Sequence, residues 1–216
     1  MKFFIIIKEH SERLVNKNFL NLGDKPLFKH ILDELSGEEI FIDTDSNMLY
    51  QNLKNTDVTC YERDSHHIKL EVDNTFKVSP VLLMIENFLD KYVTDENEVI
   101  VTPHVTSPFI KLSTIVKASN KLNEGYDSVQ ACTEHQEFTY FKGQPVNFNP
   151  DVVQKTQDLE PVVMGNGAFF IFTKKTFKEH NNRAGKNPYF YPITFPESVE
   201  IDNKEDWKLA RRIYEG

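Results

Sequence analysis

Glu200 and Asp202 are two carboxylates separated by one apolar residue, Ile201. In an extended segment alternate side chains point to opposite faces, so we expect both carboxylates on one face and Ile201 in the core. Neighbouring carboxylates repel each other unless a positive group lies between them, and a hard cation with oxygen ligands commonly fills that role. Asp43 and Asp45 repeat the spacing. Together the two pairs suggest a metal–phosphate substrate, although a single Asp-x-Asp more often marks only an acidic strand end.

Three cations, Lys8, Arg13 and Lys17, lie in the polar loop after the first expected strand, together with the neutral side chains of Ser11 and Asn18. Cationic side chains and loop amides in such a place suit a triphosphate. A solvated surface loop is the alternative that this segment leaves open.

Other polar groups lie close to expected strand ends. Thr106 and Ser107 can hydrogen-bond a base or a sugar, or cap the next helix, and Asn166 can receive a substrate hydroxyl or form a plain turn. His104 precedes the Thr-Ser-Pro turn, and the histidines show no His-x-x-x-His metal spacing. Because no nucleophile with a partner base emerges, positioning and charge neutralisation fit better than covalent catalysis.

The elements that must position these residues alternate along the chain. Strands are expected over residues 3–7, 39–43, 58–61, 99–101, 128–132, 167–173 and 199–202, and helices over 26–35, 46–53, 79–92, 111–122 and 206–214. This alternation predicts an α/β fold with a mostly parallel sheet and helices on both faces. Ligands of such sheets bind at the carboxyl ends of the strands, where most of the candidate residues lie.

Bulk properties disfavour several classes of function. A net charge of −8 and a pI near 5.4 argue against a nucleic-acid partner, which selects a basic surface. The first apolar run, residues 3–7, is too short for a signal core or a membrane span. Cys60 and Cys132 have no ligand-like spacing and fit a reducing compartment. We therefore expect a cytoplasmic protein with no membrane partner.

The length predicts a single domain over residues 1–216. Between residues 134 and 164 the pattern breaks into short polar and aromatic pieces with turn residues. We expect a hairpin-like excursion from the sheet there.

An ordered set of motifs resembles the acylneuraminate cytidylyltransferase family, whose members make CMP-sialic acid and related CMP-sugars. The resemblance runs through most of the chain. It is carried by Lys17-Asn18, Leu22-Gly-Asp-Lys-Pro-Leu27, Asp43-Thr-Asp45, Thr106-Ser-Pro-Phe-Ile-Lys111, Gln157-Asp-Leu159, Asn166-Gly-Ala-Phe-Phe-Ile171, Pro188-Tyr-Phe-Tyr191, Ser198-Val-Glu-Ile-Asp202 and Glu205-Asp-Trp207. Each motif is weak alone, and their order makes the set specific.

The resemblance implies a three-layer, Rossmann-like nucleotidyltransferase fold, with CTP as co-substrate and Mg²⁺ as cofactor. It also implies a homodimer whose subunits exchange the 134–164 excursion. The implied reaction is attack of a sugar-acid hydroxyl on the α-phosphate of CTP, with pyrophosphate leaving. Arg63 falls on a nucleotide-contacting arginine of the family, and His104 on its sugar-contacting glutamine.

The sequence therefore predicts four groups of site residues. We expect Arg13, Lys17 and Asp202 to act in catalysis; Lys8, Ser11, Arg13, Lys17, Asn18, Asp45 and Arg63 to bind the nucleotide; His104, Thr106, Ser107, Lys111, Gln157 and Asn166 to bind the acceptor; and Glu200 and Asp202 to hold the metal.

The chain departs from the family pattern in the phosphate loop and at the acceptor. His10 stands where the family has glycine, Glu12 where it has a triphosphate-binding cation, and Thr156 where it has a sialate-binding arginine. The acceptor therefore need not be sialic acid. Two alternatives stay open: a catalytically silent nucleotide-binding relative, and a metal-dependent glycosyltransferase that uses Asp43-Thr44-Asp45 as its metal motif.

Overall fold

The computed structural model describes residues 1–11, 13–73 and 80–216. Within these residues the central sheet has seven strands in the order β11-β7-β10-β6-β1-β4-β5. They are β1 (Lys2–Ile7), β4 (Glu39–Thr44), β5 (Thr59–Glu62), β6 (Val99–Pro103), β7 (Ser128–His135), β10 (Val162–Thr173) and β11 (Pro188–Pro192). β10 runs antiparallel to β6 and β7, and the other neighbouring pairs are parallel. The predicted mostly parallel α/β sheet is confirmed.

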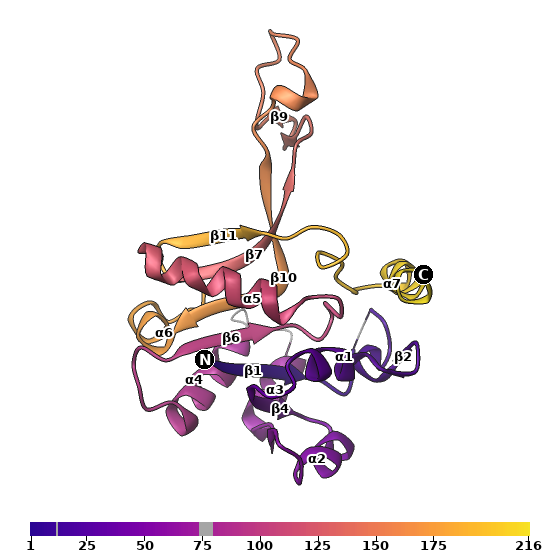
Figure 1. Cartoon of the computed structure of the whole chain (residues 1–216), viewed down its shortest axis with the longest axis vertical. Helices are drawn as coiled ribbons and strands as arrows, with labels where there is room; N and C mark the ends of the chain where they lie inside the picture. Colours follow the sequence, from indigo (N-terminus) through magenta and orange to yellow (C-terminus); the bar gives the residue numbers. More distant parts are fainter. Residues whose placement is uncertain (12, 74–79) are drawn as a thin grey trace.

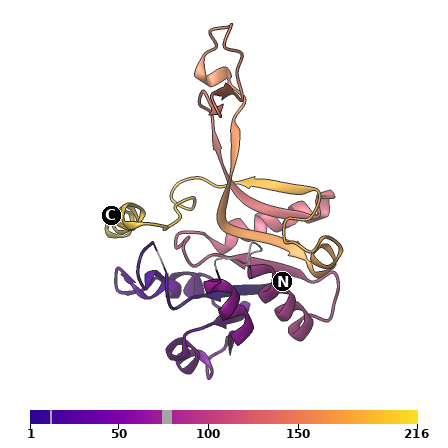
Figure 2. The same cartoon turned by 180° about the vertical axis from the view of Figure 1, so that it is seen from behind.

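Helices cover both faces of this sheet. One apolar core includes residues of α1 (Leu27–Glu34), α2 (Asn47–Leu53), α5 (Leu112–Ser119) and α7 (Lys204–Glu215), and the other includes residues of α4 (Val81–Tyr92) and α6 (Lys174–His180). Figure 1 shows α5 lying across the sheet, and Figure 2 shows the molecule from the opposite side. In β1, Phe3 and Ile5 pack into the first core and Phe4 into the second. A strand buried on both faces requires such a continuous apolar run.

Shorter elements surround the carboxyl ends of β1 and β5. The 3₁₀ helix η1 (Lys17–Phe19) and the small hairpin of β2 (Asn21–Leu22) and β3 (Lys25–Pro26) lead into α1, and α3 (Ser65–Val72) follows β5. The remaining 3₁₀ helices of the described residues are η2 (Asn120–Glu124) and η3 (Thr156–Asp158).

A narrow arm projects from the body of the molecule (Figure 1). The ends of β7 and β10 pair beyond the sheet, from Val162 opposite His135 to Gly165 opposite Cys132. The distal part holds the hairpin of β8 (Tyr140–Phe141) and β9 (Gln144–Pro145) and the short helix η3. The arm occupies the stretch, 134–164, where the sequence pattern breaks.

The prediction of a last strand over 199–202 is wrong. This segment does not pair with a neighbouring strand. Its one backbone hydrogen bond to a distant part of the same chain runs from the Ile201 N–H to the carbonyl of Thr106, at 2.7 Å. The strand that completes the sheet is instead β11, which has proline at both ends. Such prolines are tolerated because β11 is an edge strand. In the sequence they indicate a turn or loop, and for this reason the strand was not predicted.

Two helix predictions also need comment. α3 was not predicted, and it begins where the Asp64 side chain accepts a hydrogen bond from the His66 N–H. The predicted N-cap of the helix over 79–92, Ser79, lies outside the described residues, and α4 begins at Val81. In the described part of the chain, no helix combines the length and apolarity that crossing a bilayer requires.

Candidate active site

A cavity of ≈550 Å³ opens at the carboxyl ends of β1, β4 and β6. Its walls include six of the seven predicted nucleotide-binding residues: Lys8, Ser11, Arg13, Lys17, Asn18 and Asp45. His104 and Thr106, both predicted to bind the acceptor, also line it. This is the edge at which ligands of doubly wound sheets bind.

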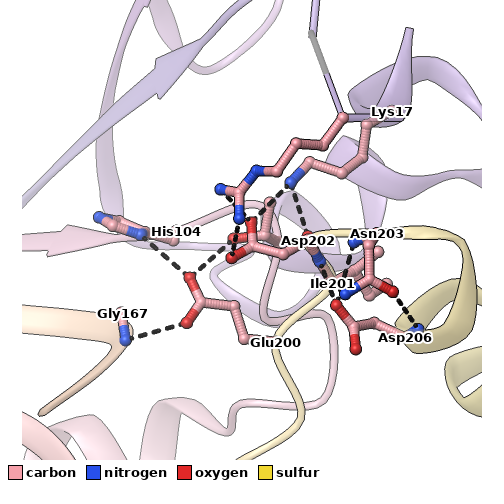
Figure 3. A network of polar contacts seen from close by, with 10 residues as sticks. Lys17, His104, Gly167, Glu200, Ile201, Asp202, Asn203 and Asp206 are labelled. Carbon is pink, nitrogen blue, oxygen red and sulfur yellow. Dashed lines mark hydrogen bonds and ion pairs between the residues drawn. The ribbon is translucent and has the colours of Figure 1, made fainter. Parts of the chain in front are cut away.

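The two carboxylates of the segment 200–202 lie beside this cavity because the residue between them anchors the chain. Ile201 is fully buried, and its carbonyl accepts a 2.6 Å hydrogen bond from the Lys17 ammonium. Asp206 in the first turn of α7 accepts hydrogen bonds from the N–H groups of Asp202 and Asn203. The predicted division, with Ile201 inward and the carboxylates outward, therefore holds without a strand (Figure 3).

Asp202 is neutralised by two side chains of the β1 loop. Arg13 donates from Nη1 to Oδ2 and from Nη2 to Oδ1, both at 3.0 Å, and Lys17 Nζ lies 3.2 Å from Oδ1. The Arg13 side chain is 68% exposed, whereas that of Lys17 is only 10% exposed. Lys17 is thus a fixed part of the site, and Arg13 contacts Asp202 from the solvent side.

Glu200 is held by a different set of groups. The Gly167 N–H donates to Oε2 at 3.2 Å, the Thr106 hydroxyl donates to Oε1 at 3.4 Å, and His104 Nδ1 lies 3.8 Å from Oε1 (Figure 3). The adjoining His104 side chain, aided by the Gly167 N–H and Lys17, lowers the pKa of Glu200 although burial opposes this. A Cβ at position 167 would lie 2.4 Å from Glu200 Oε1, so glycine makes room for the carboxylate.

The β1 loop is folded by its own polar groups. Asn18 donates from Nδ2 to the carbonyl of Lys8 at 2.9 Å, which ties the two ends of the loop together. Asp45 accepts a 2.7 Å bond from the Glu9 N–H, and the Lys8 ammonium lies 2.8 Å from a carboxylate oxygen of Glu71 in α3. Asn18 and Asp45 therefore shape the cavity wall as well as lining it.

Arg63 does not face the cavity. Its side chain is fully buried, with Nε 2.5 Å from Asp43 Oδ1 and Nη1 2.7 Å from Glu71 Oε2. The predicted nucleotide contact of Arg63 thus finds no support in this geometry, because its charge is already paired inside the protein. Asp43 is fully buried in the same pair, so Asp43-Thr44-Asp45 offers only the Asp45 carboxylate to the cavity, whereas a glycosyltransferase metal motif needs both.

The model of the cytidylyltransferase family matches residues 5–215. The chain belongs to this family. An N-acylneuraminate cytidylyltransferase of Streptococcus agalactiae serotype III is 28% identical over 211 residues, which cover 91% of this chain and 49% of that protein. N-acylneuraminate cytidylyltransferase A of Danio rerio is 29% identical over 126 residues, which cover 54% of this chain and 29% of that protein. The chain spans about half the length of the streptococcal relative.

Solved structures agree on the fold. CMP:2-keto-3-deoxy-manno-octonic acid synthetase, solved in complex with CTP, has a TM-score of 0.64 at 11% identity, covering 98% of this chain and 96% of the other. A 4-diphosphocytidyl-2C-methyl-D-erythritol synthase of Anaerococcus prevotii has a TM-score of 0.65 at 13% identity, covering 100% and 96%. The expected three-layer, Rossmann-like nucleotidyltransferase fold is confirmed.

Four predicted acceptor-binding residues of this cytidylyltransferase-family chain are not among the residues that line the cavity. Ser107 is fully buried, Lys111 pairs with Glu34 in α1, and Gln157 lies on the arm. The Asn166 side chain bonds the backbone on both sides of the site: its Nδ2 donates to the Ser198 carbonyl, and its Oδ1 accepts from the Ala168 N–H. These bonds place β10 against the segment that carries Glu200.

The sequence reading missed two charged residues of the cavity wall, Glu71 and Arg183. Glu71 comes from the unpredicted helix α3. Arg183 comes from the loop between α6 and the unpredicted strand β11, so nothing in the sequence placed that loop beside the cavity.

The donor set suits a magnesium ion bound together with a phosphate. Across residues 1–11, 13–73 and 80–216, no group of three or more His, Cys, Asp or Glu side chains is arranged to hold a metal on its own. Mg²⁺ commonly takes one or two protein carboxylates and completes its octahedron with water and substrate phosphates. Glu200 and Asp202, on one side of a buried residue, fit that requirement.

Proposed function

We propose that this chain transfers CMP from CTP to an acidic sugar, such as a 2-keto sugar acid, and releases pyrophosphate. A hydroxyl oxygen of the acceptor attacks the α-phosphorus, the bond from that phosphorus to the oxygen bridging to the β-phosphorus breaks, and the hydroxyl proton passes to solvent. One observation carries the proposal: the loop cations Arg13 and Lys17, which line the cavity, both contact the carboxylate of Asp202. Phosphoryl transfer depends mainly on such positioned opposite charges.

The residues divide into phosphate-binding and metal-binding groups. Lys8, Arg13 and Lys17 would neutralise the triphosphate. Ser11 lines the same cavity, and its hydroxyl would add a neutral hydrogen bond to the nucleotide. Glu200 and Asp202 would hold Mg²⁺, which when bound neutralises phosphate charge and orients the triphosphate. The low pKa of Glu200 keeps it ionised at neutral pH, as a metal ligand must be.

The acceptor class rests on the relatives. The curated relatives are N-acylneuraminate cytidylyltransferases, and one structural neighbour is a synthetase of CMP:2-keto-3-deoxy-manno-octonic acid. Both names denote sugar acids. The cavity of ≈550 Å³, lined in part by apolar side chains, supplies room for a sugar ring.

We further propose a homodimer assembled through the arm. The arm carries exposed apolar side chains, including Phe138, Tyr140, Phe141, Val153 and Met164. Contiguous exposed apolar surface on a narrow projection is typical of a protein interface. Gln157 lies on this arm, so its predicted acceptor contact would be made in the cavity of a partner. The two cysteines are free thiols, in keeping with the cytoplasmic location that we expect.

A second candidate is a silent nucleotide-binding relative, and one observation favours it. All three loop cations already have carboxylate partners: Lys8 pairs with Glu71, and Arg13 and Lys17 pair with Asp202. A triphosphate must compete with these pairs. Position 12, where the family has a further cation, is glutamate and lies outside the described residues.

A pyrophosphate-release assay separates the candidates. Each of the four ribonucleoside triphosphates is incubated with Mg²⁺ and either an N-acylneuraminic acid or 2-keto-3-deoxy-manno-octonic acid. We expect release with CTP and at least one acid, and no release by Asp202→Asn. Asp90→Asn, which alters a surface ion pair on α4 with Lys178, is the matched control and should leave the rate unchanged. A CTP-dependent rise in melting temperature without any pyrophosphate would establish the silent relative.

A further inference from the structure

Arg183 occupies an unusual place in the cavity wall. It lies in the loop between α6 and β11, and its guanidinium carbon is 3.6 Å from the centroid of the Phe170 ring. Phe170 belongs to β10 and is 9% exposed, so the guanidinium stacks on the edge of the second apolar core. The Arg183 side chain also lines the cavity, together with Phe4, Ile6 and Val81.

This cation has no acidic partner among the described residues. The three cations of the β1 loop and Arg63 are all paired with carboxylates: Lys8 with Glu71, Arg13 and Lys17 with Asp202, and Arg63 with Asp43. Burial lowers the pKa of Arg183 to about 10, with no carboxylate to raise it. A partly buried guanidinium without an anion is unfavourable, and stacking on an aromatic ring offsets only part of this cost. An anion from outside the chain would complete the site.

The loop that carries Arg183 is fixed in place. Asn182 Oδ1 accepts from the N–H groups of Ala184 and Gly185 at 2.8 and 2.7 Å. Asp127 Oδ2 accepts from the N–H groups of the next two residues, at 2.7 and 2.8 Å. Gly185 has φ +63°, and a Cβ there would lie 2.3 Å from Asp127 Oδ1. The loop is therefore built before any ligand arrives, so little ordering cost accompanies binding.

Arg183 and the metal-binding carboxylates are linked through one short path of contacts. The Phe170 ring lies 6.1 Å from the His104 ring, and His104 Nδ1 lies 3.8 Å from Glu200. The phosphate-binding cations come from the β1 loop instead. Arg183 thus reaches the cavity beside Phe170 of β10, and not from the β1 loop.

We propose that Arg183 binds the carboxylate of the sugar-acid acceptor. The proposal rests on the CMP-transfer function above and assigns the acceptor end of the same cavity. A guanidinium that stacks by its face on an aromatic ring keeps its edge N–H groups free, and these match a planar carboxylate with two parallel hydrogen bonds. The apolar side chains of Phe4, Ile6 and Val81 line the same cavity, and they suit the carbon skeleton of a sugar better than a polyphosphate.

The test compares each acid with its methyl ester, which keeps the skeleton and removes the charge. The probes are 2-keto-3-deoxy-manno-octonic acid and an N-acylneuraminic acid, with CTP and Mg²⁺. The variants are Arg183→Gln, Arg183→Lys and, as matched control, Lys186→Gln, which removes an exposed cation from the same loop. Melting temperatures establish that each variant is folded. Calorimetric binding of the acids to each protein supplies a readout that needs no turnover.

Wild-type protein should prefer the acid over its ester, and Arg183→Gln should raise KM for the acid about ten- to a hundredfold, as expected for a charge-assisted hydrogen bond. KM for CTP and KM for the ester should stay within about twofold, and Arg183→Lys should recover part of the loss. Equal loss for acid and ester, a raised KM for CTP, or the same effect from Lys186→Gln would overturn the proposal.

Failure of the two proposals can be told apart. If no acceptor yields pyrophosphate but the acids bind in an Arg183-dependent manner, CMP transfer is wrong and the carboxylate site stands. If wild-type protein turns over CTP while acid and ester bind equally well, the carboxylate site is wrong and the transfer function stands. If the acids do not bind wild-type protein at all, Arg183 has no such role.

Discussion

Arg13 and Lys17 contact the same carboxylate, yet the structure predicts very different energies for the two contacts. The perturbation is a pair of double-mutant cycles, one with Arg13→Gln and Asp202→Asn and one with Lys17→Gln and Asp202→Asn. Both measure coupling in the protein without nucleotide or Mg²⁺.

The magnitudes follow from exposure. Arg13 and Asp202 have side chains 68% and 36% exposed, and exposed ion pairs contribute only about 0.2–1 kcal/mol; the two parallel bonds place this pair at the upper end of that range. The Lys17 side chain is 10% exposed, and a hydrogen bond to a charged group contributes about 1.5–3 kcal/mol. Removing the Asp202 charge would leave the Lys17 ammonium with the Ile201 carbonyl alone. We therefore expect the Lys17–Asp202 coupling to exceed the Arg13–Asp202 coupling by about 1 kcal/mol or more.

Urea unfolding at low and high salt measures both couplings. The Arg13 coupling should shrink at 1 M salt, where the Debye length is only about 3 Å, and the Lys17 coupling should persist. Arg211 and Glu215 on α7 provide a control pair at 3.0 Å with side chains 57% and 60% exposed. This pair makes a single bond, so its coupling should not exceed that of Arg13 and Asp202, which make two. Equal couplings for Arg13 and Lys17, or an Arg13 coupling that resists salt, would refute the reasoning.

Three further predictions concern the carboxylate, its glycine and the arm. In the folded protein the pKa of Glu200 lies below its ordinary 4.5, so the ionised carboxylate stabilises the fold above pH 4.5, and this stabilisation is lost as the pH falls further. In urea titrations, the difference in free energy of unfolding between wild type and Glu200→Gln should therefore narrow below pH 4.5. Gly167→Ala would force the Glu200 carboxylate to move, and turnover should fall about a hundredfold with little change in melting temperature; unchanged turnover would contradict this. Tyr140→Ser with Phe141→Ser should weaken dimerisation about a hundredfold in sedimentation experiments, since two exposed aromatic rings lose their partner surface. A wild-type monomer at assay concentrations would refute the role of the arm.

Local patterns were enough to predict six of the seven strands of the sheet and the placement of Glu200 and Asp202 on either side of a buried residue. The continuous apolar run of β1 indicates burial on both faces, and the alternation around Ile201 indicates one buried side chain between two partly exposed ones. Both are properties of consecutive residues. The same alternation also misled, because an extended segment with an inward Ile201 does not need a strand partner.

Ion pairing between distant elements could not be predicted in this way. Arg63 looks like any loop cation in the sequence, and only the fold brings Asp43 and α3 around it. Arg183 is the reverse case. Its importance lies in the lack of a carboxylate partner among the described residues, and a sequence does not show which charges remain unpaired.

These pairings bear on how a nucleotide would enter the site. Two neighbouring carboxylates require compensating partners, and in this structure the protein itself supplies them: the cations Arg13 and Lys17 for Asp202, and the His104 ring with a backbone N–H for Glu200. A metal-bound triphosphate brings both the cation that the carboxylates need and the anion that Arg13 needs. Binding would then exchange partners without leaving an unpaired charge, so its net electrostatic gain is small. It follows that the weakly coupled Arg13, and not the buried Lys17, is the side chain best able to move from Asp202 to the phosphates.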